Sequence, residues 1–247
     1  MATEFVSINM SRSKTISILI TALIVLGSAL VLWHAQALDN RIVISQNLIY
    51  ENPLYLKIFQ IISKYGMGFI AIVYGFLALL TFKFEELKPM RPLFLLIIFT
   101  FSFGSISGDL LKEVVNRARP VAELAGQIAS TTLPGSPSFP SGHATKSMTL
   151  ALPFFLMAMS KDLVTRLVKA LTMISAVLVC YSRIALQRHY LSDVLGGIGI
   201  ALLFVVIANW LVNRFTVRMK IDQARLAIVT KRLGFVFFGL AVLLVMI

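Results

Sequence analysis

Two histidines and a group of basic residues stand in three short polar stretches of an otherwise apolar chain. The stretches cover residues 112–120, 140–143 and 182–193. The chain has three histidines in all, and two of them fall here. Histidine is both a nucleophile and an acid–base group, and lysine and arginine bind phosphate oxygens. The combination therefore indicates phosphoryl transfer.

Lys112, Arg119 and Arg183 lie close to the ends of apolar runs. A charged side chain at membrane depth is costly and usually has a functional partner. Three cations brought together without carboxylates repel one another, and a bound phosphate relieves that repulsion. The alternative for any one of them alone is a side chain that reaches from a helix end to the membrane surface. Their occurrence together with two histidines favours an anion site.

Residues 140–143 read Pro-Ser-Gly-His and directly precede an apolar run. Because serine is a preferred N-cap, Ser141 predicts the start of a helix whose free N–H groups and positive dipole end face an anion. Gly142 allows the backbone to approach that anion closely. Alone, the string also fits an ordinary helix cap followed by a chance histidine, so the interpretation of His143 depends on the other two stretches.

His189 and Asp193 are four residues apart. If a helix begins by His189, both side chains lie on one helix face. The carboxylate then accepts a hydrogen bond from the imidazole Nδ1–H and leaves Nε2 free as a nucleophile. The alternative is a histidine at a helix end, followed by an acidic residue in the first turn.

A metal site is another interpretation of the same residues. His143, His189 and Asp193 would supply two imidazoles and one carboxylate. The same neighbourhood would also hold the three basic residues, whose charges disfavour a divalent cation and favour an anion. We therefore expect a phosphate site without a metal ion.

The three stretches follow the patterns KxxxxxxRP, PSGH and SRxxxxxHxxxD. With them the chain resembles the type 2 phosphatidic acid phosphatase superfamily, whose integral-membrane branch acts on lipid phosphates. The resemblance covers about residues 15–213 and implies a metal-independent phosphatase without a cofactor. The implied substrate is undecaprenyl diphosphate, phosphatidylglycerophosphate or phosphatidic acid, hydrolysed through a phosphohistidine. A lipid A phosphatase or phosphotransferase is the alternative within the class, and a transporter or a phosphatase of water-soluble substrates is the alternative outside it.

The resemblance also implies roles by matched position. His189 is expected to be the nucleophile, Asp193 its orienting acid, and His143 the general acid for the leaving group. The residues expected to bind phosphate oxygens are Lys112, Arg119, Ser141, Gly142 and Arg183.

Some polar residues near the motifs receive no catalytic role. Arg117 and Arg188 lie inside the motifs at variable positions, and Lys146 is expected to face the membrane interface. Residues 120–140 are expected to shape a headgroup pocket.

The composition is that of a membrane protein. Of 247 residues, 58% are hydrophobic and 14% are charged, against about 25% charged in a soluble domain. The net charge of +12 lies mostly between apolar runs, as membrane topology requires. We therefore expect membrane lipids and a lipid phosphate as partners, and no nucleic acid. The one cysteine, Cys180, lies in an apolar run and cannot form an internal disulfide.

Six apolar runs predict an all-α membrane bundle of about six transmembrane helices. They cover residues 15–38, 54–82, 92–111, 144–160, 164–187 and 190–213. We expect a single domain over residues 1–247, with its core at about 15–213, followed at 214–247 by a basic segment and a C-terminal apolar helix. That helix is either a short further span, which takes in residues 227–229, or an interfacial helix.

The distribution of basic residues predicts the orientation. With the N-terminus in the cytoplasm, the cytoplasmic segments hold most of the basic residues, and the three motif stretches fall together on the other side. We expect a bacterial inner-membrane protein with its active site on the periplasmic, extracytoplasmic face.

Overall fold

The computed structural model describes residues 8, 10–131, 135–158 and 163–246. Every regular element among these residues is a helix, so the predicted all-α class is confirmed. The long helices are α1 (Arg12–His34), α4 (Pro53–Leu80), α5 (Arg91–Val115), α7 (Gly142–Met157), α8 (Leu163–Ala185), α9 (Leu191–Arg218) and α10 (Gln223–Met246). The short ones are α2 (Gln36–Ile44), α3 (Asn47–Glu51), a 3-10 helix (Glu85–Met90) and α6 (Pro120–Glu123).

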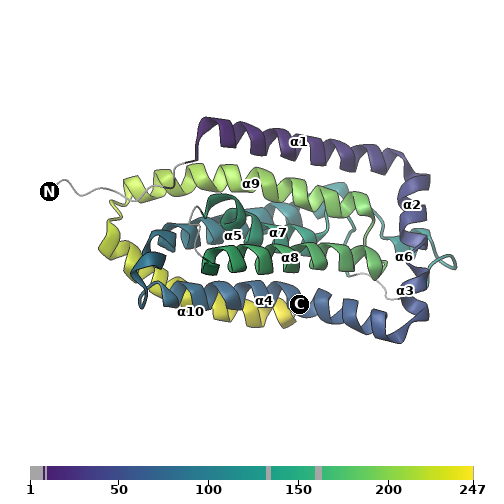
Figure 1. The fold of residues 1–247 in the computed structure, drawn as a ribbon. Helices are drawn as coiled ribbons and strands as arrows, with labels where there is room; N and C mark the ends of the chain where they lie inside the picture. Colours follow the sequence, from purple (N-terminus) through teal and green to yellow (C-terminus); the bar gives the residue numbers. More distant parts are fainter. Residues whose placement is uncertain (1–7, 9, 132–134, 159–162, 247) are drawn as a thin grey trace.

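The long helices run side by side in one bundle (Figure 1). Helix α1 lies outermost and packs on α9, whereas α4 and α10 pack together on the opposite side. Helix α7 contacts α4, α5, α8 and α9, and most of its residues are buried. Helices α2 and α3 cross one end of the bundle between α1 and α4 (Figure 1). The core of the bundle is therefore built around α7.

Among the described residues, six helical segments are long and apolar enough to cross a membrane. Five are α1, α4, α8, α9 and α10, and the sixth is the segment Glu85–Glu123 that contains α5. The run expected at 144–160 instead forms the 16-residue helix α7, which is shorter than the ~20 residues of a typical span. Residues 159 and 160 of that run lie outside the described residues.

The C-terminal apolar stretch forms part of α10, a helix of 24 residues that includes positions 227–229. It runs along α4 within the bundle rather than across the bundle end (Figure 1). Of the two alternatives for this segment, the further span is therefore the one that fits the fold. Residue 247 lies outside the described residues.

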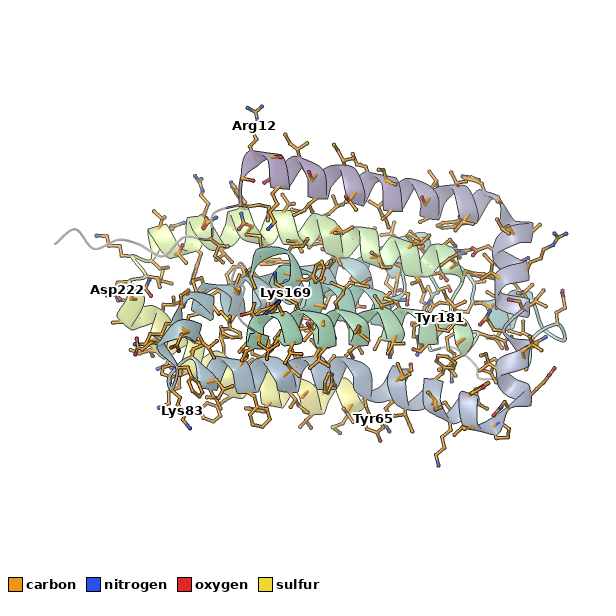
Figure 2. All side chains as sticks on the ribbon, viewed as in Figure 1. Arg12, Tyr65, Lys83, Lys169, Tyr181 and Asp222 are labelled. Carbon is orange, nitrogen blue, oxygen red and sulfur yellow. The ribbon has the colours of Figure 1, made fainter. Side chains whose placement is uncertain are left out.

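The two ends of the bundle differ in their residues. Arg12, Lys83 and Asp222 lie toward one end, and Tyr181 lies toward the other end (Figure 2). The short helix α6, which begins at the last residue of the first motif stretch, lies at the end away from the start of α1 (Figure 1). The first motif stretch thus ends toward the same end of the bundle as Tyr181, which directly precedes the third stretch.

Candidate active site

The three motif stretches meet at one cavity of about 330 Å³. Six of the eight expected site residues line it: Lys112, Arg119, Gly142, His143, Arg183 and His189. The other two, Ser141 and Asp193, are fully buried, and the Ser141 N–H donates to the Asp193 carbonyl oxygen at 3.0 Å. The structure therefore brings together residues that are up to 81 positions apart in the chain.

The C-terminal end of α5 positions Lys112, the first of the three cations. Asn116 takes a left-handed backbone conformation, with φ 46°, and its N–H donates to the Lys112 carbonyl oxygen. Asparagine tolerates this conformation better than most residues and commonly terminates a helix there. Helix α5 consequently ends one turn beyond Lys112, whose Nζ donates to the Pro137 carbonyl oxygen at 2.9 Å.

The other two cations are held by neutral acceptors. Arg119 donates from Nε to the Ser136 carbonyl oxygen at 2.8 Å and from Nη2 to the Ser136 hydroxyl at 3.1 Å. Arg183 donates from Nη1 to the Ser63 hydroxyl of α4, and its buried Nε has no hydrogen-bond partner among the residues that the structure describes. Within the described part of the chain, no carboxylate forms a salt bridge with Lys112, Arg119 or Arg183. The cavity thus has the excess of positive charge that an anion would neutralise.

Ser141 occupies the N-cap position of α7, as expected, but its hydroxyl makes no capping hydrogen bond. The Oγ atom is buried and has no partner among the described residues. A buried hydroxyl without a partner is costly, so this oxygen is available to a ligand. A Cβ added at Gly142 would meet only the Lys112 side chain, at 3.5 Å. The absence of a side chain at Gly142 therefore leaves space for a ligand to approach the backbone, rather than for another helix.

The closest helix contact at the site involves Gly197 of α9. A Cβ at this position would lie 2.9 Å from the Ser141 carbonyl oxygen and 2.9 Å from the Thr145 hydroxyl. Only glycine lets α9 approach the first turn of α7 this closely. The contact holds the helix start that carries His143 against the helix start that carries Asp193.

The condition that a helix begins by His189 is not met, although the apolar run predicted from residue 190 does form a helix. Helix α9 begins at Leu191, with Tyr190 as its N-cap, because the Asp193 carboxylate accepts the Tyr190 N–H at 2.9 Å. His189 therefore precedes the helix, and its Nδ1 lies 3.5 Å from Oδ2 of Asp193. The two side chains still face each other, through a turn rather than along one helix face.

Ser138 is a polar neighbour of this pair that the sequence analysis missed. Its hydroxyl donates to Oδ2 of Asp193 at 2.5 Å and lies 3.4 Å from Nδ1 of His189. The Ser138 N–H in turn donates to the Arg117 carbonyl oxygen at 2.8 Å. No sequence spacing links Ser138 to residues more than fifty positions away.

Arg117, interpreted above as a variable position without a role, is instead central to the site. Its buried guanidinium donates from Nη1 to Oδ1 of Asp193 at 2.8 Å and from Nη2 to Oδ2 of Asp39 at 3.2 Å. Asp39 of α2 is fully buried and also accepts from the Ser192 hydroxyl. The guanidinium lies 4.7 Å from the ring of Trp33 and 4.2 Å from that of Tyr190. The buried charge of Arg117 is therefore paired with two carboxylates and stacked on two aromatic rings, so that it belongs to an extended network of ion pairs and hydrogen bonds.

Lys146 also departs from the expectation that it faces the membrane interface. It lines the cavity and forms an ion pair with Asp109 of α5 at 3.6 Å. Asp109 and Glu113 line the same cavity. The α5 side of the cavity thus carries acidic groups beside the cations Lys112, Arg119 and Arg183.

Burial lowers the pKa of His189 well below its usual value, and the positive charges of Arg119, Arg183 and Lys112 lower it further. The imidazole is therefore neutral at physiological pH, which is the form in which its ring nitrogen can attack. Among the described residues, the histidine, cysteine and acidic side chains form no group of three or more placed to hold a metal ion.

The sequence and the fold are similar to those of known proteins. Residues 90–217 match the PAP2 superfamily. Human sphingosine-1-phosphate phosphatase 2 is 26% identical over 167 residues, which are 66% of this chain and 39% of the relative. Phosphatidylglycerophosphatase B of Bacillus subtilis is 32% identical over 120 residues, 45% of this chain and 55% of the relative. The chain thus spans about half or less of the curated relatives that it matches.

A solved structure also has the same fold. It is the crystal structure of a transmembrane PAP2-type phosphatidylglycerolphosphate phosphatase from Bacillus subtilis. The TM-score is 0.56 at 24% identity, over 83% of this chain and 97% of that one. The matched segment contains all three motif stretches and ten of the twelve described residues that line the cavity. The chain belongs to the PAP2 superfamily.

Proposed function

We propose that the protein hydrolyses the phosphomonoester of a membrane lipid through a phosphohistidine on His189. One observation carries the proposal: three cations without carboxylate partners surround a cavity that both His143 and His189 line. A lipid phosphate supplies the missing negative charge, and the histidines supply the chemistry. Two relatives are named for lipid monophosphates, sphingosine 1-phosphate and phosphatidylglycerophosphate.

In the first step, the neutral Nε2 of His189 attacks the phosphorus while the bond to the ester oxygen breaks. Asp193 orients the imidazole and stabilises the positive charge that forms on it. Burial and the charge of Arg183 lower the pKa of His143, and a bound phosphate dianion, which offsets that positive charge, raises it again. His143 then donates a proton to the leaving alkoxide, so that the lipid departs as an alcohol. Lys112, Arg119 and Arg183 stabilise the charge on the equatorial oxygens, together with the Gly142 N–H and the Ser141 hydroxyl at the start of α7.

In the second step, water attacks the phosphohistidine. His143, now neutral, accepts a proton from the water, and the phosphorus–nitrogen bond breaks. Inorganic phosphate leaves, His189 is again neutral, and His143 carries the proton needed for the next cycle. The two histidines thus return to their starting states.

The acidic groups on the α5 side of the cavity favour a monophosphate over a diphosphate. Asp109 and Glu113 line the cavity next to the cations. A second phosphate group, displaced toward this side, would lie near carboxylates and be repelled. Phosphatidic acid and phosphatidylglycerophosphate are therefore favoured over undecaprenyl diphosphate.

The orientation proposed for the protein places the N-terminus in the cytoplasm and the cavity on the extracytoplasmic side of a bacterial inner membrane. The support is the positive-inside distribution of the basic residues and the position of α6 and Tyr181, which adjoin the first and third motif stretches, toward the end of the bundle opposite Arg12 (Figures 1 and 2). A phosphate at headgroup depth would reach the cavity from that side.

The proposal is tested by phosphate release from purified, detergent-solubilised protein in the presence of EDTA. The substrates are phosphatidic acid, phosphatidylglycerophosphate, an undecaprenyl diphosphate analogue, lipid A and glycerol 3-phosphate. We expect release from a lipid monophosphate that is abolished in His189→Ala, while a matched His34→Ala variant retains activity. Absence of release from every lipid would contradict the proposal, and loss of activity in EDTA that a divalent metal restores would revive a metal site.

A further inference from the structure

Helix α10 lies outside residues 90–217, which match the family, yet one of its residues reaches the cavity. Leu244 lines the cavity together with Met67 of α4. Both side chains are buried, with exposed fractions of 3% and 1%. We propose that the end of α10 forms the wall against which the lipid's hydrocarbon chain lies, with Leu244 as a residue that determines substrate specificity. This inference rests on the proposed function.

Helix α10 fills the space between α4 and α5, which make little direct contact with each other. Its fully buried Phe237 packs on Tyr74 of α4, with ring centroids 5.8 Å apart, and on Phe94 of α5 at 6.0 Å. A wall built from α4 and α5 alone would therefore be incomplete at this position, and α10 completes it.

The register of α10 against α4 places its end beside the cavity. A Cβ at Gly75 would meet the ring of Phe238 at 3.0 Å, and one at Gly68 would meet Val245 at 2.9 Å. Because α4 starts at residue 53 and α10 ends next to residue 68, the first part of α4 extends beyond the end of α10. The last turn of α10 thus lies at the level of Met67, where the cavity ends.

Met67 and Leu244 are the two apolar side chains among the described residues that line the cavity. Ser63 of α4 accepts a hydrogen bond from Arg183, one of the cations that line it. Met67, one turn further into the membrane, lies with Leu244 in the part of the cavity lining that carries no charge. A lipid held by its phosphate in the polar part would direct its chains toward the membrane centre, and hence toward these two side chains.

The size of the cavity limits how much of the lipid it encloses. A volume of about 330 Å³ is near the lower end of ligand pockets, which run from about 300 to 1,000 Å³. It suits a phosphate with the first part of the lipid attached to it. The exposed Asp109, with a side-chain exposure of 56%, lines the cavity on the α5 side, so the cavity is not closed there and need not enclose the whole lipid.

The first test enlarges Leu244 and compares it with its neighbour Leu243, which is 58% exposed on the lipid-facing side of α10. Leu244→Trp overpacks the wall, and we expect kcat/KM for dioleoyl phosphatidic acid to fall about tenfold. Leu243→Trp should behave as the wild type. The inhibition constant of inorganic phosphate, which needs only the polar part, should be unchanged in both variants.

Equal activity of the two tryptophan variants toward phosphatidic acid would overturn the inference. So would weaker inhibition by phosphate in Leu244→Trp, since that would mean that the change acts through the phosphate site. The same assay also tests the proposed function separately. If the wild type hydrolyses no lipid phosphate, the proposed function is refuted, whatever the two variants show.

A second test does not depend on turnover or on a bulky substitution. In a Cys180→Ala background, which removes the one native thiol, Leu244→Cys places a thiol on the wall of the cavity, and Leu243→Cys places one on the exposed side of α10. Both thiols are labelled with N-ethylmaleimide. We expect a non-hydrolysable dialkyl phosphonate analogue of phosphatidic acid to slow labelling of Leu244→Cys, while inorganic phosphate and the Leu243→Cys variant show no protection. Labelling of Leu244→Cys that the phosphonate leaves unchanged would contradict contact with the lipid chain.

Discussion

Several groups besides His189, the histidine that Asp193 is expected to orient, hold the Asp193 carboxylate in place. Its Oδ1 accepts from Arg117, and its Oδ2 accepts from the Ser138 hydroxyl and the Tyr190 N–H. His189 is the most distant of these neighbours, at 3.5 Å. The position of the carboxylate is therefore fixed independently of the imidazole. A carboxylate fixed in this way can stabilise the positive charge that forms on the imidazole in the transition state.

We expect Arg117→Lys to lower kcat by about 10–100-fold with little change in KM, because an ammonium cannot bridge two carboxylates as the planar guanidinium does. The matched control is Arg188→Lys, at the other variable position within the motifs. Steady-state kinetics on the best lipid substrate measures both, and thermal unfolding checks the fold. An unchanged kcat in a folded Arg117→Lys variant would contradict the positioning role.

Residue types and spacing were sufficient to predict the histidines and cations that line the cavity, six of the twelve described lining residues with Gly142 and without Lys146, because phosphoryl transfer needs histidines and cations in a few arrangements. They were insufficient for Arg117, Ser138 and Asp39. Each of these acts through a partner that the fold supplies from a distant segment: Asp39 contacts Ser192 across 153 positions. Such contacts leave no local pattern, and only the bundle geometry reveals them.

At the scale of elements, the site is built from the ends of four helices. Helices α5 and α8 contribute their C-terminal turns, and α7 and α9 contribute their starts. Apolar runs predicted these helices, but the boundaries shifted where side chains cap the backbone, as at Tyr190 and Asp193. The shortness of α7 was also not predictable, since a helix enclosed by other helices need not match the bilayer thickness.

The contact of α9 with α7 at Gly197 gives a prediction at this scale. Gly197→Ala would force the start of α7 away from α9, and overpacking of this kind costs about 1–3 kcal/mol. A displacement of about 1 Å at reacting groups can cost about a hundredfold in rate, so we expect a large loss of kcat in a folded protein. Gly27→Ala on α1 is the control, because a Cβ there meets nothing within 4 Å. Equal activity of the two variants would contradict the positioning of α7 by this contact.

For the whole molecule, composition and apolar runs predicted a helical membrane bundle, and the bias of basic residues agreed with the meeting of the three motifs at one cavity. Which helices are neighbours was beyond the sequence, because buried and lipid-facing sides of a membrane helix are similarly apolar. The place of α10 between α4 and α5 is the clearest case. Its apolar residues predicted a helix but carried no information about the cavity beside Leu244.

The central claim is that His189 carries the phosphoryl group between the lipid and water. Rapid acid-free quenching of the wild type with ³²P-labelled lipid monophosphate, followed by peptide mapping, tests it directly. The account predicts an acid-labile, alkali-stable label on the peptide that contains His189, which forms and decays at rates consistent with turnover and is absent from His189→Ala. Turnover without a labelled enzyme, or a label that persists in His189→Ala, would contradict it.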